Sequence, residues 1–155
     1  MADGTEHAPP DQRRPSQRIT GRLTGRQIGP YELLALLGQG AMGAVYLAEH
    51  MDTEGRVALK VMGGHLLEDE ESLRRFELEL AALIKLRHPN VIAVHDAGVM
   101  SDGRPYYAMD YVEGETLRDA QKHGLALEQG LDVLEHMGRA LGHAHEQGLV
   151  HRDFK

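Results

Sequence analysis

The sequence contains no cysteine and no tryptophan among its 155 residues. Without cysteine it can form neither disulfides nor cysteine-ligated zinc sites, and this usage fits a reducing cytosol. No run of about 18 apolar residues is present, and the N-terminal stretch MADGTEHAPPDQ is too polar for a signal peptide. We therefore expect a cytoplasmic location and no membrane contact for this sequence.

Basic residues are also few: the sequence has 17 lysines and arginines and 24 acidic residues, which gives a formal net charge of -7. Nucleic acids and anionic membrane surfaces attract basic proteins, so neither is expected as a partner. The composition, 41% hydrophobic and 26% charged, is that of an ordinary globular protein of one domain.

Residues 1–27 lack hydrophobic periodicity and carry Pro9, Pro10 and Pro15 among arginines and acids. Such a segment buries too little apolar surface to offset the conformational entropy lost on ordering, so we expect a disordered N-terminal tail. Ser16 has the basic surroundings typical of a phosphorylated serine, but serines are common in such tails and we assign it no role.

Short β-prone runs begin at residue 28 and are separated by turn-forming residues, which predicts an antiparallel meander. Apolar residues at spacings of three and four predict an amphipathic helix over 72–86. Two more strand-like runs, 91–97 and 105–112, are joined by the turn-rich stretch MSDGR. Together these elements predict an α+β unit of five strands and one helix.

The pattern becomes helical after Gly114, with a short helix near 116–122 and a longer one over 127–147 that Gly148 ends. The apolar residues of the longer helix share one face. They are Leu127, Leu131, Leu134, Met137, Leu141 and Ala144. We expect this face to be unsatisfied in the chain alone, and therefore to aggregate or to await a partner.

A glycine-rich motif contains Gly38, Gly40 and Gly43 in the spacing GxGxxG. In a dinucleotide-binding unit the third glycine opens a helix, whereas residues 44–49 alternate like a strand. In a strand-turn-strand loop, glycines let backbone N–H groups close over phosphates because no Cβ intervenes. A glycine-rich hairpin without a ligand is the alternative for this motif alone, and the absence of Gly-Lys-Ser/Thr excludes a Walker loop.

Lys60 ends the apolar run VALK at 57–60. A lysine on a strand is usually just solvated, but below a glycine loop its ammonium could reach the α- and β-phosphates of a nucleotide. A buried cation then needs a carboxylate partner. Glu77 and Glu79 both flank the apolar stripe of the following helix, and periodicity does not choose between them.

The order of the motifs resembles that of protein kinases, and most closely the bacterial serine/threonine kinases of the eukaryotic-like (Hanks) type. After the glycine loop and VALK come HPNVI at 88–92, YYAMDYVEGETL at 106–117 and GLVHRDFK at 148–155. The resemblance implies a kinase N-lobe with its hinge over 28–112, made of the five-stranded antiparallel sheet and the αC helix. The first helices of an incomplete, mainly α C-lobe would follow over 113–155.

The same resemblance implies roles for individual residues, all of which would otherwise be taken for core or surface positions. Glu79 would pair with Lys60, Met109 would be the gatekeeper, and the backbone from Asp110 to Val112 would form the hinge that binds adenine. An apolar roof over the base would consist of Leu37, Val45 and Ala58.

The chain ends in His151-Arg152-Asp153-Phe154-Lys155, which resembles the start of a kinase catalytic loop. There the aspartate accepts the proton of the substrate hydroxyl, and a lysine two positions later, as in the Ser/Thr-directed branch, contacts the transferring phosphate. An exposed charged terminus is the alternative for this motif in isolation.

ATP and Mg²⁺ are the cofactors that the resemblance implies, and proteins with Ser or Thr are the implied substrates. The family's magnesium ligands, an asparagine and the DFG aspartate, are absent from this sequence, and so is its activation segment. His143 and His145 cannot share an ion because residues two apart on a helix point to nearly opposite sides. We assign no metal site and expect no appreciable phosphoryl transfer by this chain alone.

The sequence therefore favours the ATP-binding portion of a signalling serine/threonine kinase, truncated within the catalytic loop. A non-catalytic, pseudokinase-like module that binds a nucleotide or a partner is the second hypothesis. A dinucleotide-binding domain is the third, and the strand after the glycines speaks against it.

Overall fold

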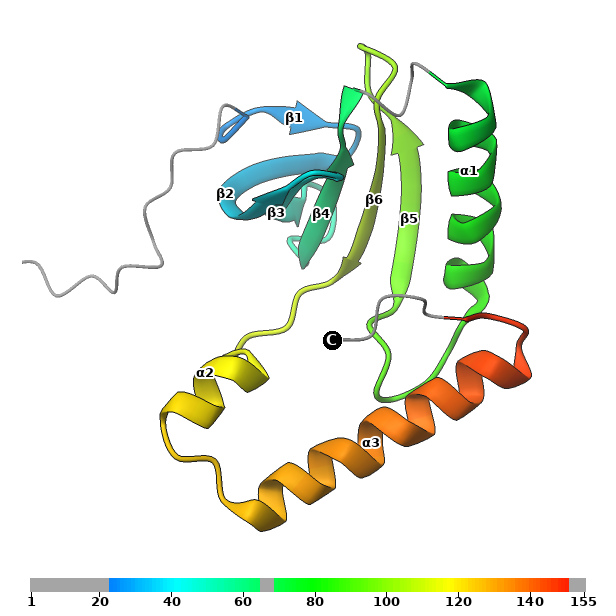
Figure 1. Cartoon of the computed structure of the whole chain (residues 1–155). Coiled ribbons are helices and arrows are strands. Elements are labelled where there is room, and N and C mark those ends of the chain that lie inside the picture. The colour runs from blue at the N-terminus through cyan, green and yellow to red at the C-terminus, as the bar shows by residue number, and fades with distance from the viewer. Residues whose placement is uncertain (1–22, 65–68, 151–155) are drawn as a thin grey trace, which may run out of the picture.

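The computed structural model describes residues 23–64 and 69–150, and its main feature is a curled antiparallel sheet (Figure 1). Its strands are β1 (Gln27–Ile28), β2 (Tyr31–Gly40), β3 (Gly43–His50), β4 (Arg56–Met62), β5 (Val94–Val99) and β6 (Pro105–Asp110). They lie side by side in the order β1-β2-β3-β4-β6-β5. The α+β class is confirmed, whereas the predicted count of five strands is one too low because β1 was missed.

Helix α1 (Glu70–Lys85) joins β4 to β5 and packs along β5 (Figure 1). It begins two residues earlier than predicted because the Asp69 carboxylate accepts hydrogen bonds from the backbone N–H groups of Glu71 and Ser72. Such an N-cap satisfies donors that have no partner within the helix. The helix ends before Leu86, and Leu80 is its buried residue.

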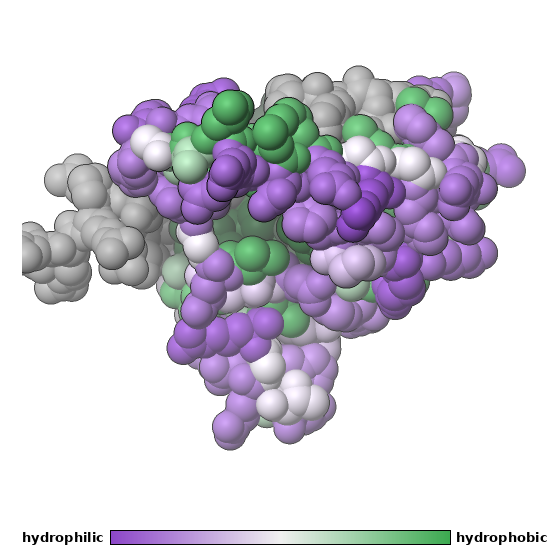
Figure 2. All heavy atoms as spheres, turned by 90° about the horizontal axis from the view of Figure 1, so that it is seen from below, coloured by the Kyte–Doolittle hydropathy of each residue, from purple (hydrophilic) through white to green (hydrophobic). Residues whose placement is uncertain are grey.

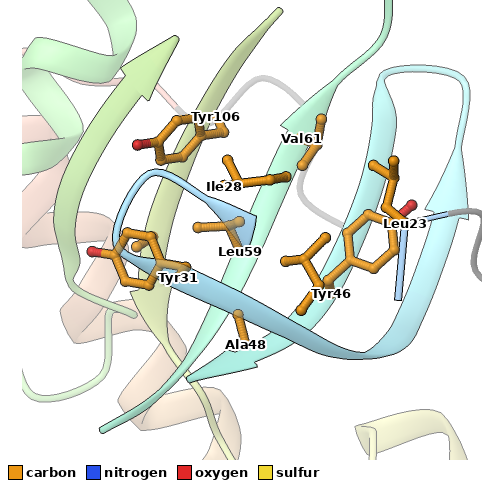
Figure 3. Packing of buried hydrophobic residues seen from close by; sticks show 10 residues of the cluster. Leu23, Ile28, Tyr31, Tyr46, Ala48, Leu59, Val61 and Tyr106 are labelled. Carbon is orange, nitrogen blue, oxygen red and sulfur yellow. The ribbon is translucent and has the colours of Figure 1, made fainter. Parts of the chain in front are cut away.

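The hydrophobic core fills the inside of the curled sheet (Figure 3). Leu33 and Leu59 are essentially inaccessible to solvent, and Tyr31 and Tyr106 pack edge to face with ring centroids 6.4 Å apart. Alternation along each strand sends every second side chain into this core and the others to the opposite face. The opposite side of the sheet takes no part in this core, and α1 packs on it through Phe76 and Tyr107.

The folded part begins earlier than the predicted boundary at residue 28. Leu23 is only 9% exposed and belongs to the core, and the backbone N–H of Gly25 donates to the carbonyl of Leu33 at 2.7 Å. The prediction of a disordered tail to residue 27 is therefore wrong for 23–27. Its remainder, including Ser16, lies outside the described residues.

The chain leaves β6 and forms α2 (Leu117–Lys122) and α3 (Leu127–Glu146), within a residue or so of the predicted ranges. Neither helix contains a buried residue, and Leu127, Leu131 and Leu134 are 79%, 56% and 62% exposed. The other residues of the predicted apolar face, Met137, Leu141 and Ala144, are half-buried, so the face is bare only in its N-terminal half. Figure 2 shows apolar side chains at the surface of the molecule seen from below.

Within residues 23–64 and 69–150, no helix combines the length and the apolar content that crossing a bilayer requires.

Candidate functional site

The predicted site residues of the sheet gather on the face opposite the core. Directly paired residues of antiparallel strands point to the same face. Lys60 on β4 pairs with Val45 on β3 and with Tyr107 on β6, and Ala58 pairs with Met109. The cross-strand register therefore places Val45, Ala58, Lys60 and Met109 together, although they are up to 64 positions apart in the sequence.

The glycine-rich motif forms the hairpin between β2 and β3, and its three glycines differ in what surrounds them. Gly43 has φ +138°, and a Cβ there would lie 2.1 Å from the carbonyl oxygen of Val61. The protein's own backbone thus requires glycine at this position. A Cβ at Gly38 or Gly40 would meet nothing within 4 Å, so the loop is open where a ligand could approach its backbone.

Leu37 precedes this loop in a β-bulge. The β2–β3 register shifts between Leu36 and Gly38, which leaves Leu37 without a partner and 46% exposed. A bulge redirects a side chain that regular pairing would have fixed. Of the three predicted roof residues, Leu37 is exposed, Val45 half-buried and Ala58 buried.

Lys60 is half-buried, and no ion pair among the described residues joins it to Glu79. Glu79 is exposed on α1, which lies on the same side of the sheet as the lysine, since Phe76 of that helix contacts Tyr107. The predicted pairing of Lys60 with Glu79 is therefore not made in this structure, but the helix that carries Glu79 is on the correct side for it.

The Lys60 ammonium instead lies over the ring of Tyr107, 5.7 Å from the ring centroid. Phe76 packs against the same ring, with centroids 6.4 Å apart and an interplanar angle of 36°. Sequence reasoning treated both residues as ordinary strand and helix positions. Only the register of β4 against β6 could have identified Tyr107 as the neighbour of Lys60.

Asp110, at the end of β6, anchors the start of the predicted hinge to residues 93 and 95. Its backbone N–H donates to the carbonyl of Ala93, and its carboxylate accepts the N–H of Ala93 at 2.9 Å and contacts His95 Nε2 at 2.6 Å. The Ala93 N–H, assisted by His95, holds the pKa of the Asp110 carboxyl below its usual range. The carboxylate is thus committed to β5, while Val112 beyond it is 66% exposed.

A cavity of about 630 Å³ lies on the other side of the glycine hairpin. Its lining includes the core-facing residues Leu23, Tyr46 and Val61, but not Lys60 or Met109. Gly40 and Gly43 of the predicted site also line this cavity, so it borders the site at the glycine hairpin, whereas Lys60 and Met109 lie on the open face of the sheet away from it. Asp153 and Lys155, the predicted catalytic residues, lie outside the described residues.

Comparisons of the chain with known proteins point to one family. A family model described as "Protein kinase domain" matches residues 31–155. The serine/threonine-protein kinase PrkC of Bacillus subtilis is 37% identical over 136 residues, and PknA of Mycobacterium tuberculosis is 40% identical over 146 residues. These alignments cover 86% and 90% of the chain but only 21% and 33% of the relatives, so the chain spans a third or less of their length.

A solved structure shows the same fold. The crystal structure of the Mycobacterium tuberculosis PknI kinase domain superposes with a TM-score of 0.72 at 35% sequence identity. The match covers 85% of this chain and 54% of the PknI chain. The curled sheet, α1 and the helices after β6 therefore have counterparts in a solved kinase domain.

Proposed function

The chain belongs to the protein kinase family, and we propose that the face of its sheet opposite the core binds ATP. The observation that carries this proposal is the position of Lys60 beside Ala58 and Met109, below an open glycine hairpin. We assign residues 28–112, together with the segment 23–27 that packs on them, to the N-lobe with its hinge, and residues 113–155 to the start of the C-lobe.

The residues of this face fit the two chemically different ends of ATP. Ala58 and Val45 present small apolar side chains, against which a flat base can lie, next to Met109 and the backbone of Asp110 to Val112. At the other end, the space around Gly38 and Gly40 is open, so phosphates can approach the loop backbone, and the Lys60 ammonium supplies a positive charge for the α- and β-phosphates.

We propose that the whole protein transfers the γ-phosphoryl group of ATP to Ser or Thr, because its relatives PrkC and PknA are named serine/threonine-protein kinases. The hydroxyl oxygen forms a bond to the γ-phosphorus, the bond to the β–γ bridging oxygen breaks, and Asp153 takes the hydroxyl proton. Lys155 contacts the transferring phosphate, and Glu79 pairs with Lys60 in the nucleotide complex.

Mg²⁺ supplies positive charge to the phosphates in such reactions. No cluster of His, Asp or Glu suited to a metal ion occurs within residues 23–64 and 69–150, so no step is assigned to a metal held by these residues.

Calorimetric titration of the 155-residue chain with ATP, adenosine and NAD tests the proposed site. We expect ATP to bind and NAD not to compete. Lys60→Met should weaken ATP binding at least tenfold and leave adenosine binding unchanged, because the lysine contacts only phosphates. Lys85→Met, which removes an exposed lysine of α1, is the matched control. ATP binding by Lys60→Met at the affinity of the unchanged chain would refute this assignment.

A non-catalytic module that binds a partner is the second candidate, and the exposure of Leu127, Leu131 and Leu134 favours it. The two candidates differ in phosphoryl transfer rather than in nucleotide binding. We expect the 155-residue chain to transfer no appreciable phosphate from labelled ATP to a Ser/Thr peptide, a result that both candidates allow for this chain alone. Turnover comparable to that of a full kinase domain, measured in parallel, would rule out the second candidate.

A further inference from the structure

Lys60 has an aromatic neighbour where a carboxylate was predicted. Its ammonium is 5.7 Å from the centroid of the Tyr107 ring, within the range of a cation–π contact, which extends to about 6 Å. The described residues provide no ion-pair partner for this ammonium, although Lys60 is half-buried. The ring face is therefore the favourable electrostatic contact that the structure gives to this charge.

The position of the ring is fixed from two directions. Tyr107 is the direct cross-strand partner of Lys60, so both side chains rise from the same face of neighbouring strands. On the side of α1, Phe76 packs against the ring with centroids 6.4 Å apart. The ring thus lies between the lysine and the helix that carries Glu79.

We propose that Tyr107 is a positioning residue that holds the Lys60 ammonium on the nucleotide face of the sheet before a nucleotide binds. This inference rests on the proposed function, because the value of holding the ammonium there is that phosphates bind to it.

A ring and a carboxylate hold a lysine with different consequences. The carboxylate of Glu79 would neutralise the ammonium, whereas the neutral ring attracts it through its quadrupole and leaves the net positive charge in place. An ammonium has three N–H donors, so it can lie over the ring and still donate to phosphate oxygens. The Tyr107 contact is therefore compatible with phosphate binding, and its loss frees the lysine to adopt other rotamers.

Calorimetry on the full chain tests whether Tyr107 acts through Lys60. Tyr107→Leu should weaken ATP binding about three- to fivefold, the size expected of one cation–π contact at a partly exposed site. Adenosine binding should not change, and Tyr107→Phe, which retains a ring face, should bind ATP nearly as the unchanged chain does. In the Lys60→Met background, Tyr107→Leu should have no further effect. Equal losses for ATP and adenosine, or additive losses in the double variant, would overturn the proposal.

Nuclear magnetic resonance tests the contact without any nucleotide. The ε-methylene protons of Lys60, assigned by their absence in Lys60→Met, should be shifted upfield by the ring current in the unchanged chain and in Tyr107→Phe. The shift should vanish in Tyr107→Leu, and an unshifted signal in the unchanged chain would overturn the proposal. A chain that binds no ATP would instead refute the proposed function, and the ring-current shift would still decide whether Tyr107 holds the lysine.

Discussion

The two halves of the chain carry equally regular apolar patterns but bury them very differently. In the sheet, Leu33 and Leu59 are 1% and 0% exposed, whereas Leu127 and Leu134 on α3 are 79% and 62% exposed. The sheet curls and so supplies the opposing surface for its own apolar face, as Figure 3 shows. Helix α3 is partly covered towards its C-terminus, where Leu141 is half-buried and His143 stacks on His88, but its N-terminal leucines remain exposed. An apolar pattern thus predicts which face of an element is suited to burial, but burial itself requires a partner.

The energetic consequence is that the two halves should differ in stability. Burial of one large apolar side chain contributes about 1.5–3 kcal/mol, so the bare leucines of α3 forgo on the order of 5 kcal/mol. That amount is comparable to the whole stability of a small domain, roughly 5–15 kcal/mol. We expect the sheet with α1 to unfold cooperatively and α3 to open at much lower free energy.

The largest expected effect comes from shortening a leucine in each half. Leu59→Ala, at a fully buried position, should lower the free energy of unfolding by about 2–5 kcal/mol, because it removes contacts and leaves a cavity. Leu131→Ala, at a position 56% exposed, should change it by less than about 0.5 kcal/mol. Urea unfolding followed by tyrosine fluorescence measures both. Equal losses would mean that α3 is covered in solution, and sedimentation would reveal self-association as the cause.

A smaller effect should separate two glycines of the same hairpin. Gly43→Ala should cost about 2–4 kcal/mol, since its φ of +138° disfavours any side chain and the Cβ would clash with the Val61 carbonyl. Gly40→Ala should stay within about 0.5 kcal/mol, because nothing lies within 4 Å of the added Cβ. Thermal unfolding compares the two variants.

ATP titration of Gly40→Ala tests whether the open part of the hairpin contacts phosphates. We expect Gly40→Ala to weaken ATP binding, because a methyl group would hold the phosphates away from the loop backbone. Unchanged ATP affinity in a stably folded Gly40→Ala would contradict the placement of phosphates at that glycine.

Alkaline pH should weaken the sheet rather than the helices. Tyr31 donates a hydrogen bond to Asp96 on β5 at 3.2 Å, and burial, reinforced by the negative charge of Asp96, raises its pKa to about 12 from an ordinary value near 10. Because the folded pKa is the higher one, the stabilisation is complete below pH 10 and is lost as pH rises through 12. The loss should amount to about 1–3 kcal/mol.

Absorbance at 295 nm and unfolding at pH 9 to 12 check this expectation. Tyr31→Phe has no group to ionise and is the matched variant, with Tyr106, whose pKa burial also raises, left in place. The alkaline loss of stability should be smaller in Tyr31→Phe. An identical pH profile in both proteins would show that Tyr31 does not carry the effect.

The sequence was sufficient for the features that depend on local pattern. Periodicity and β-prone runs predicted α1, α2, α3 and the strands β2 to β6, with boundaries within three residues of those in the structure. The start of α1 was missed by two residues because the cap is formed by the side chain of Asp69, which belongs to no apolar pattern. Leu23 and β1 were missed because one buried leucine and a strand of two residues have no detectable period.

Contacts across the sheet were harder to predict. Ala58, Lys60 and Met109 share a face because of the β4–β6 register, which the resemblance to kinases implied but alternation alone did not. Tyr107 was overlooked for the same reason, since a tyrosine on a strand does not indicate which side chain stands opposite. Lys60 lies over Tyr107, which in turn contacts Phe76 of α1. Helical periodicity predicts the apolar face of α1 but not where the helix lies relative to the sheet.

The smallest expected effect concerns the local stability of α3. Its N-cap, Ala126, offers no side-chain acceptor, and only the Gln129 side chain caps its backbone N–H. Ala126→Asp should therefore stabilise the helix by about 0.5–1 kcal/mol. Gly138→Ala should add a similar amount, because the added Cβ meets nothing within 4 Å and the unfolded state loses freedom.

Hydrogen exchange of the α3 amides measures these gains, and the sheet amides of the same samples are the internal control. The N-terminal half of α3 has little packing and depends on its own caps and helix propensities, so both substitutions should slow exchange in α3 and leave the sheet unchanged. If neither substitution alters α3 exchange while the helix is already as protected as β4, then tertiary contacts stabilise it in solution. The sheet and α3 would then not differ in stability as argued above, because the leucines of α3 would be covered in solution.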